Sequence, residues 1–542
     1  MFNKTNKIMS LFDKASLVLT PNGVKEGKLY SVKPTDGSGD LDVVRATTAT
    51  RVNSDGLIEV VPYNLLTYSE QFDNATWTKV NSTITANQAT APNGTLTADL
   101  YTATTASDRI QSAAPAISAT YTFSIWVKNT GSNVDGIITF GGIGTETFTA
   151  TSEWQRIIAT ATTNLAPSLR LQDAGESVYI WGAQLVEGTE AKDYYPTETR
   201  LNIPRLDYSN GSCPSILVEP QRTNLALRSE EFDNASWNKA ELNISGTPAW
   251  VNVTEAPDGT MTSEKIIPNT TNASHFFFQN AATVLGTFYT ISVFAKAGEN
   301  TILQITGSTG FEIIFANFDL INGIVSNTNG GVANIQPMGG GWYRCSYTLQ
   351  SNATGGSNRM VLAIVPSPTS TRLESFAGNN SNGLFIWGAQ LEAGANATSY
   401  IPTVGSQITR NQDVISKTGI SDVLLSNGYS ILINIQVDSL SVYSQFQFRE
   451  SPLNYILRVG SQIKVANATS INNTLGFNKI MVSVLSNGNY TLYKNGLIIQ
   501  SGTGVTGNLS QINTDAVGYK IKNIQLYKTA LTDQECINLT TI

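Results

Sequence analysis

His275 is the only histidine in the 542-residue chain, and three phenylalanines follow it directly. A catalytic triad needs a histidine beside a nucleophile, with a third group that orients the ring. The sequence offers no second histidine, and its three cysteines stand far from His275 and from one another. We therefore expect His275 to be structural or exposed and not catalytic.

Four carboxylates recur as matched pairs in two similar stretches of sequence: Glu70 with Glu230, and Asp73 with Asp233. Glycoside hydrolysis needs two carboxylates on either side of one sugar bond. A pair that occurs twice, beside an aromatic residue expected in the core, favours a role in the fold, such as capping a loop. We expect no catalytic residue and no enzymatic activity, and keep a capsule depolymerase as an alternative.

Aromatic side chains are the other residues that can recognise a ligand here, because flat rings stack on the faces of sugars. Six of the eight tryptophans form matched pairs and are expected in the core: Trp77 with Trp237, Trp154 with Trp342, and Trp181 with Trp387. Three aromatic residues differ between the copies or have no counterpart, and we take them as carbohydrate-binding candidates: Trp126, Phe294 and Trp250. The alternative for each is burial against a neighbouring subunit.

The sequence predicts no cofactor, and calcium is the one metal to consider. Lectin-like sandwiches hold calcium with loop carboxylates and carbonyl oxygens. Four aspartates lie in loops of this kind: Asp36, Asp40, Asp73 and Asp207. No EF-hand spacing is present, and scattered aspartates are also typical of turns. An odd number of scattered cysteines predicts neither a disulfide framework nor a zinc site.

These residues lie in a duplicated sequence. Residues 64–79 return as 224–239, and 180–185 (Ile-Trp-Gly-Ala-Gln-Leu) return as 386–391. The starts are 160 residues apart (224 − 64) and the ends 206 apart (386 − 180), so the second copy holds about 46 residues more. Such a long repeat indicates tandem domains. Tandem binding domains favour multivalent attachment, because a second site raises the effective concentration.

Alternating apolar and polar residues predict strands in both copies. In residues 121–128 and 289–296, every second side chain is apolar and the others are expected to face outward, including Trp126 and Phe294. Many short strands separated by turns predict an all-β chain of tandem antiparallel β-sandwiches of jelly-roll type, arranged as a rod. The Asn495-Gly496 pair predicts a hairpin turn, and Thr532 with Glu535 predicts the N-terminus of a short helix.

Five segments are expected from these patterns. They are an N-terminal segment that needs to dock on something to become ordered (1–62), a first repeat (63–199), a proline-rich connector (200–223), a second repeat (224–403) and a C-terminal domain (404–542).

Composition excludes several classes of partner. The net charge is −7 and there is no basic run, which argues against nucleic acid. No apolar stretch approaches the roughly 18 residues of a membrane span. The first twenty residues lack the apolar core and cleavage site of a signal peptide. We expect assembly in a host cytoplasm and release by lysis as part of a particle.

The run from Ser16 to Asn53 resembles the start of fibre and spike proteins of tailed phages, including crAss-like phages. The connector 205–224 and the segments 64–77 and 224–237 are similar to the carbohydrate-binding modules repeated in such proteins. From about residue 425 the chain is similar to a concanavalin-A-like (laminin-G-like) lectin domain.

The resemblance implies a virion surface protein. Its N-terminal segment would be anchored on the capsid or another virion protein, it would assemble as a homotrimer or homodimer, and its modules would bind glycans. A capsid (head) fibre is the leading hypothesis, because no coiled-coil stalk or β-helix is predicted. A tail fibre or tailspike that recognises a host receptor is the first alternative. A bacterial surface adhesin is a further one, disfavoured by the missing secretion signal.

Overall fold

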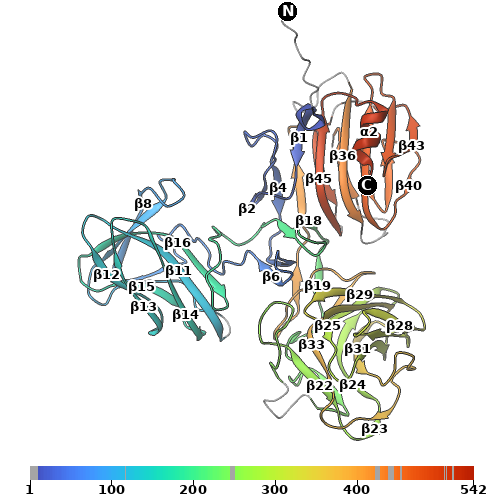
Figure 1. Cartoon of the computed structure of the whole chain (residues 1–542), viewed down its shortest axis with the longest axis horizontal. Helices are drawn as coiled ribbons and strands as arrows, with labels where there is room; N and C mark the ends of the chain where they lie inside the picture. Colours follow the sequence, from blue (N-terminus) through green and yellow to red (C-terminus); the bar gives the residue numbers. More distant parts are fainter. Residues whose placement is uncertain are drawn as a thin grey trace, which may run out of the picture. The chain divides into compact units, whose positions relative to one another are not determined.

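The computed structural model describes residues 10–115, 118–243, 251–420, 428–437, 445–451, 454–505, 507, 509–515 and 518–542. Within these ranges the chain consists of antiparallel sheets and two short helices, α1 (Leu11–Lys14) and α2 (Asp533–Thr540) (Figure 1). The predicted all-β class is therefore confirmed. No helix in the described ranges is long and apolar enough to span a bilayer. Two compact units are present, Val60–Ile203 and Met1–Glu59 with Pro204–Ile542.

The unit Val60–Ile203 is one sandwich of two five-stranded sheets with a shared apolar core. One sheet has the order β13-β12-β15-β10-β7 and the other β14-β11-β16-β9-β8. The strands are β7 (Thr78–Val80), β8 (Ser82–Ala89), β9 (Ala98–Ala103), β10 (Arg109–Gln111), β11 (Ala119–Asn129), β12 (Val134–Phe140), β13 (Ile143–Ala150), β14 (Gln155–Thr163), β15 (Pro167–Leu171) and β16 (Ser177–Glu187).

The second copy forms a sandwich of two six-stranded sheets, β20-β24-β31-β26-β27-β28 and β21-β22-β33-β25-β30-β29. Its strands are β20 (Asn238–Ala240), β21 (Leu242–Asn243), β22 (Glu264–Pro268), β24 (His275–Thr283), β25 (Phe288–Lys296), β26 (Ile302–Ser308), β27 (Phe315–Asp319), β28 (Ile324–Thr328), β29 (Val332–Gly339), β30 (Trp342–Gln350), β31 (Gly355–Ile364) and β33 (Leu384–Ala393). Each sheet has one strand more than in the first copy. The consecutive strands β28 and β29 are edge strands, one in each sheet. Part of the insertion predicted from the repeat lengths therefore forms edge strands.

The C-terminal sandwich draws its strands from both ends of the chain. One sheet contains β17 (Arg205–Asp207), β18 (Ser215–Val218), β45 (Tyr519–Tyr527), β36 (Tyr429–Val437), β41 (Gly476–Val484), β42 (Tyr490–Lys494) and β43 (Leu497–Gly502), with β1 (Ala15–Leu19) also paired to β45. The other contains β2 (Val24–Lys25), β3 (Lys28–Leu29), β4 (Leu41–Val44), β35 (Val414–Lys417), β44 (Gln511–Asp515), β37 (Gln445–Arg449), β38 (Tyr455–Gly460), β39 (Gln462–Val465) and β40 (Ile471–Asn472).

Figure 1 shows β1 beside β45, and residues 17–43 supply five buried side chains to the core of this sandwich: Leu17, Leu19, Leu29, Leu41 and Val43. The N-terminal segment thus becomes ordered on the C-terminal domain. The predicted C-terminal domain, which starts at residue 404, does not include β1, β4 and β18, although these strands belong to the sandwich. Short pairs complete the fold: β5 (Ala49–Val52) with β6 (Ile58–Val61), β19 (Arg222–Asn224) with β34 (Ile408–Arg410), and β23 (Asn272–Ala273) with β32 (Phe376–Ala377).

A buried arginine–carboxylate cluster joins these segments. Arg45 Nη1 lies 2.7 Å from Asp413 Oδ1, and Arg205 contacts both Asp413 and Glu219. Arg410 Nη1 lies 2.9 Å from the same Glu219 Oε2, and each of the five side chains is at most 8% exposed. Burial alone would raise the pKa of Glu219 and of Asp413, but the surrounding guanidinium groups outweigh it and hold both values below their usual range.

Two local predictions in the C-terminal domain are confirmed. Asn495 (φ 50°) and Gly496 (φ 80°) form the turn between β42 and β43, and both have the positive φ that a type I′ turn requires. Thr532 accepts from the Glu535 amide while the Glu535 carboxylate accepts from the Thr532 amide, so the predicted capping box starts α2.

Candidate functional site

The repeated Trp-Gly-Ala-Gln motif builds the same feature on the outer face of each copy. Gly182 (φ 64°) and Gly388 (φ 63°) sit at β-bulges where β11 pairs with β16 and β25 pairs with β33. A Cβ at Gly182 would lie 3.0 Å from Trp126 Cδ1, and one at Gly388 would lie 2.8 Å from Phe294 Cδ2. Glycine is therefore required both by the backbone angle and by the ring packed against it.

The matched glutamates bind tyrosines in both copies. Tyr194 donates to Glu70 Oε1 (3.2 Å) and Tyr400 donates to Glu230 Oε1 (2.8 Å), while Ser69 and Ser229 contact the same hydroxyls. Burial raises the pKa of both tyrosines well above its ordinary value, and the adjacent carboxylates add to this shift. These contacts are those expected of residues that hold the fold together.

The matched aspartates lie at a turn whose carbonyl groups are already paired with a cation. Lys79 Nζ donates to the carbonyl oxygens of Asp73 (2.8 Å) and Asn74 (2.6 Å). In the second copy Lys239 Nζ donates to Asp233 O (3.0 Å) and Asn234 O (3.1 Å). In both copies a lysine ammonium thus binds the backbone carbonyls of this turn.

The other calcium candidates serve turns and strand contacts. Asp36 accepts from Ser38, Asp40 accepts from Ser31, and Asp207 accepts from the Val52 and Ser209 amides. No group of three or more His, Cys, Asp or Glu suited to a metal occurs in the described residues. From the sequence, calcium is only the one metal to consider, and it is not assigned to any of these aspartates.

His275 is structural. Its ring is buried in β24, with Nδ1 2.6 Å from Glu241 O and Nε2 2.8 Å from Phe376 O. The ring thus bridges the backbone at Glu241 and the backbone of β32 at Phe376. Of the two alternatives kept for this residue, structural or exposed, the ring's burial fits the first.

Glu264 is a buried carboxyl that the sequence analysis did not single out. It pairs with Ile386 as Asp99 pairs with Ile180, so the two acids are counterparts. Asp99 accepts from the Phe72 amide at 2.9 Å. Burial raises the pKa of Glu264 to about 8, with a further contribution from Asp233. The Glu264 residue is 1% exposed, which keeps it from a ligand.

The three aromatic candidates have different environments. Phe294 is 1% exposed and packs with Trp387 and Tyr400, so the expectation that it faces solvent is wrong. The Phe294 ring lies in one apolar cluster with Ile58, Trp342 and Tyr400, the last of which follows β33 at the end of the copy. Trp126 is half-buried beside Trp154 and Trp181. Trp250 lies outside the described residues.

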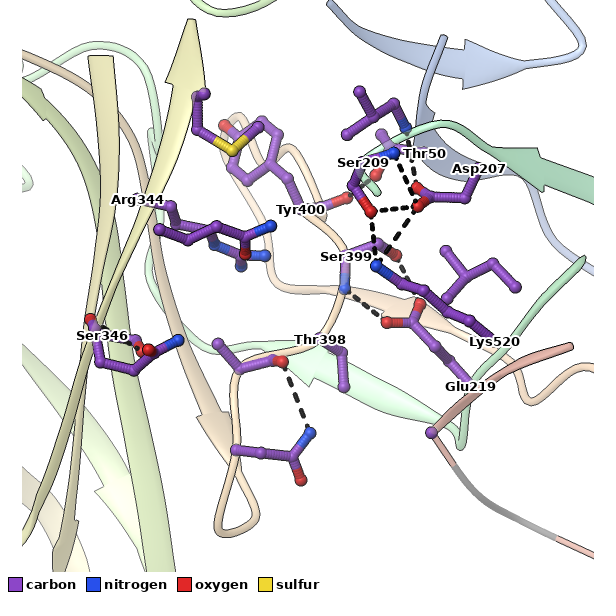
Figure 2. Close-up of a pocket in the computed structure, with 18 of the residues that line it drawn as sticks. Thr50, Asp207, Ser209, Glu219, Arg344, Ser346, Thr398, Ser399, Tyr400 and Lys520 are labelled. Carbon is purple, nitrogen blue, oxygen red and sulfur yellow. Dashed lines mark hydrogen bonds and ion pairs between the residues drawn. The ribbon is translucent and has the colours of Figure 1, made fainter. Parts of the chain in front are cut away.

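A cleft of about 610 Å³ opens beside the second copy, within the larger unit. Its wall on one side is formed by β29 and β30, and Figure 2 shows Arg344 and Ser346 on this side. On the opposite side lie Asp207, Ser209 and Lys520. The extra edge strand β29 supplies seven consecutive lining residues, 332–338. The insertion of the second copy thus builds part of the cleft.

The charges opposite Arg344 are already paired. Lys520 contacts Asp207 (3.3 Å) and Ser209, as Figure 2 shows. Glu219 accepts from the Ser399 amide (2.7 Å) and hydroxyl (2.6 Å) and belongs to the arginine–carboxylate cluster. This side of the cleft is therefore polar but internally neutralised.

Arg344 differs from its counterpart in the first copy. Arg156 donates to Ser124 (3.0 Å), Gln184 (2.5 Å) and Lys192 O (2.8 Å). Arg344 Nη2 donates to Ser292 (3.0 Å), and its buried Nε has no partner among the described residues. Burial lowers the pKa of Arg344.

A substitution between the copies accompanies this difference. Glu392 stands where the first copy has Val186. Its carboxylate accepts from the Thr398 amide (2.8 Å) and hydroxyl (2.6 Å) and from Gln390 Nε2 (2.6 Å). Gln390 Oε1 accepts from the Ile401 amide. Ser292 thus still accepts from Arg344, as Ser124 does from Arg156, whereas the counterpart of the Gln184 oxygen is taken by the Ile401 amide. Arg344 lines the cleft.

Comparison with known proteins leaves the chain unassigned. No family model matches it, and no curated protein matches it. The CBM22-1-CBM22-2 tandem of Paenibacillus barcinonensis Xyn10C matches at 12% identity over 61% of this chain and 98% of that chain, with a TM-score of 0.20. Trypanosoma rangeli sialidase, solved with sialic acid, matches at 9% identity over 97% and 96%, with a TM-score of 0.19. Likenesses this low assign neither fold nor ligand.

The sequence analysis missed the cleft and Arg344. A signal was present, because Arg156 and Arg344 stand at the same position after the matched tryptophans Trp154 and Trp342. The two copies also differ at Val186 and Glu392. The consequence of this difference cannot be read from the sequence, because it depends on the contact that Glu392 makes with Thr398 in the folded chain.

Proposed function

We propose that this chain is a glycan-binding surface fibre of a tailed phage, attached to the capsid. The observation that carries the glycan assignment is the cleft of about 610 Å³ lined by amide, hydroxyl and guanidinium groups. Sugars present dense sets of hydroxyl donors and acceptors, and a concave site with convergent polar groups matches them.

The virion assignment rests on the sequence resemblance of residues 16–53 and of the connector to phage fibre proteins. The same proposal includes assembly as a homotrimer or homodimer, attachment through the N-terminal segment and a place on the virion surface. A tail fibre or tailspike would use the same adhesive modules.

We further propose that the chain binds without turnover. The two matched acidic positions examined for hydrolysis serve tyrosine contacts and a lysine-filled turn, which supports a structural role for them.

Two experiments test the proposal. Immunogold labelling of intact virions with an antibody to residues 411–542 should mark particle heads, whereas tail labelling would favour the alternative and unlabelled particles would contradict a virion role. The purified full chain should bind immobilised glycans and leave their chain length unchanged; shortened glycans would indicate a depolymerase.

A further inference from the structure

We infer that the cleft beside the second copy recognises a glycan bearing a carboxylate, with Arg344 as the residue that contacts it. This inference rests on the proposed glycan binding and specifies its ligand class. Its basis is the geometry of one arginine that makes fewer hydrogen bonds than its counterpart: Arg344 keeps the serine contact and lacks those to glutamine and a backbone carbonyl.

The first step is the availability of hydrogen-bond donors. The Nε and Nη2 groups of Arg156 donate hydrogen bonds to Ser124, Gln184 and the Lys192 carbonyl. In the second copy the Nε of Arg344 is unpartnered within the part of the chain that the structure describes. This Nε is closed off from solvent, so it is not the atom that meets a ligand. Nη1 makes no hydrogen bond within the described residues and is not among the buried unpaired atoms, so it is the donor that Arg344 offers to a ligand in the cleft.

The second step is charge. Both carboxylates near Arg344 have cationic partners of their own: Glu392 Oε2 lies 3.5 Å from Arg222 Nε, and Glu219 binds Arg205 and Arg410. The guanidinium is flat and permanently charged, and its paired N–H groups fit the two oxygens of a carboxylate. An anionic ligand group is therefore favoured over a neutral one at this position.

The third step is the surroundings of that position. Ser346 and Thr348 follow Arg344 on the same face of β30, and Gln336 pairs with Arg344 across β29 and β30. Thr398 and Asn396 line the cleft from the tail of the copy. A row of hydroxyl and amide groups beside one cation matches a sugar acid, whose carboxylate is flanked by hydroxyl groups.

The full chain is tested by calorimetry with trigalacturonate, a hyaluronan tetrasaccharide and their methyl-esterified forms, after a glycan array that contains neutral, carboxylated and sulfated glycans. Carboxylated glycans should dominate the array. Methyl esterification should weaken binding by about tenfold or more, because it removes the charge while keeping the hydroxyl groups. This comparison needs no protein variant.

R344Q should weaken binding of the carboxylated probes to the same extent and leave binding of the esters within about twofold. R156Q is the matched control, since it changes the counterpart arginine outside the cleft, and should bind the probes like the wild type. R344K should recover only part of the affinity, because lysine keeps the positive charge but lacks the paired N–H groups of the guanidinium.

Equal binding of acids and esters, or preference for sulfated glycans without carboxylates, would overturn the inference and leave glycan binding standing. Binding that R156Q and R344Q weaken alike would also overturn it. Absence of binding to every glycan on the array would overturn the proposed function together with the inference.

Discussion

At the scale of single residues, the burial of a side chain in this protein depends on which distant segments pack over it. Phe294 and Trp126 occupy the same register in the two copies, opposite Arg344 and Arg156. Their sequence context predicts outward rings in both. Burial then depends on residues from elsewhere in the chain, and Ile58 packs into the aromatic cluster around Phe294.

At this scale, His275→Ala should lower the free energy of unfolding by about 1–3 kcal/mol, because it removes the buried ring that bridges the Glu241 and Phe376 carbonyls. Urea unfolding of the full chain measures the change. His275→Gln keeps an amide N–H donor and should lose less. Unchanged stability of His275→Ala would contradict the structural role.

A second residue-scale prediction concerns the bulge glycines. Gly388→Ala should destabilise the second copy by about 1–3 kcal/mol, because its positive φ disfavours a side chain and its Cβ would meet the Phe294 ring. Thermal unfolding measures the effect. Gly356→Ala is the control, since a Cβ there has no neighbour within 4 Å. Equal melting of both variants would refute this account of the motif.

At the scale of elements, the arginine–carboxylate cluster fixes β4, the connector and β35 to one another. Asp413→Asn removes the carboxylate that Arg45 and Arg205 share, so buried positive charge stays uncompensated. We expect a loss of about 3–5 kcal/mol in unfolding free energy. An Asp42→Asn variant, whose ion pair with Lys28 is exposed, should change stability by less than about 1 kcal/mol.

The same cluster sets a pH dependence. The pKa values of Asp413 and Glu219 are lower in the folded protein than in the unfolded chain, so the unfolded chain binds more protons. Their contribution is fully present above about pH 5 and is lost as the pH falls toward the folded pKa values. Unfolding measured from pH 6 to pH 3 should show a steep loss that Asp413→Asn makes shallower; parallel curves would contradict this.

At the scale of the whole molecule, the two ends of the chain share one core. Deleting residues 1–48 removes β1 to β4, so β45 and β35 each lose a paired strand and the core loses the side chains that residues 17–43 supply. The C-terminal sandwich should then lose cooperative unfolding and become sensitive to protease, which limited proteolysis measures. Deleting residues 1–9 is the control and should leave it resistant. A resistant sandwich without residues 1–48 would show that the N-terminal strands are dispensable.

The sequence by itself determined the all-β class, the duplication, the turn at Asn495-Gly496 and the cap at Thr532, because alternation, turn chemistry and capping depend on residues close in the chain. For His275 the sequence left two alternatives open, structural or exposed, and its burial became visible only in the fold. Tertiary structure alone decided the burial of Phe294, the shared core of the two ends and the exposure of Arg344 to the cleft. Each of these depends on contacts between segments far apart in the chain, and no local pattern records which segment covers which face.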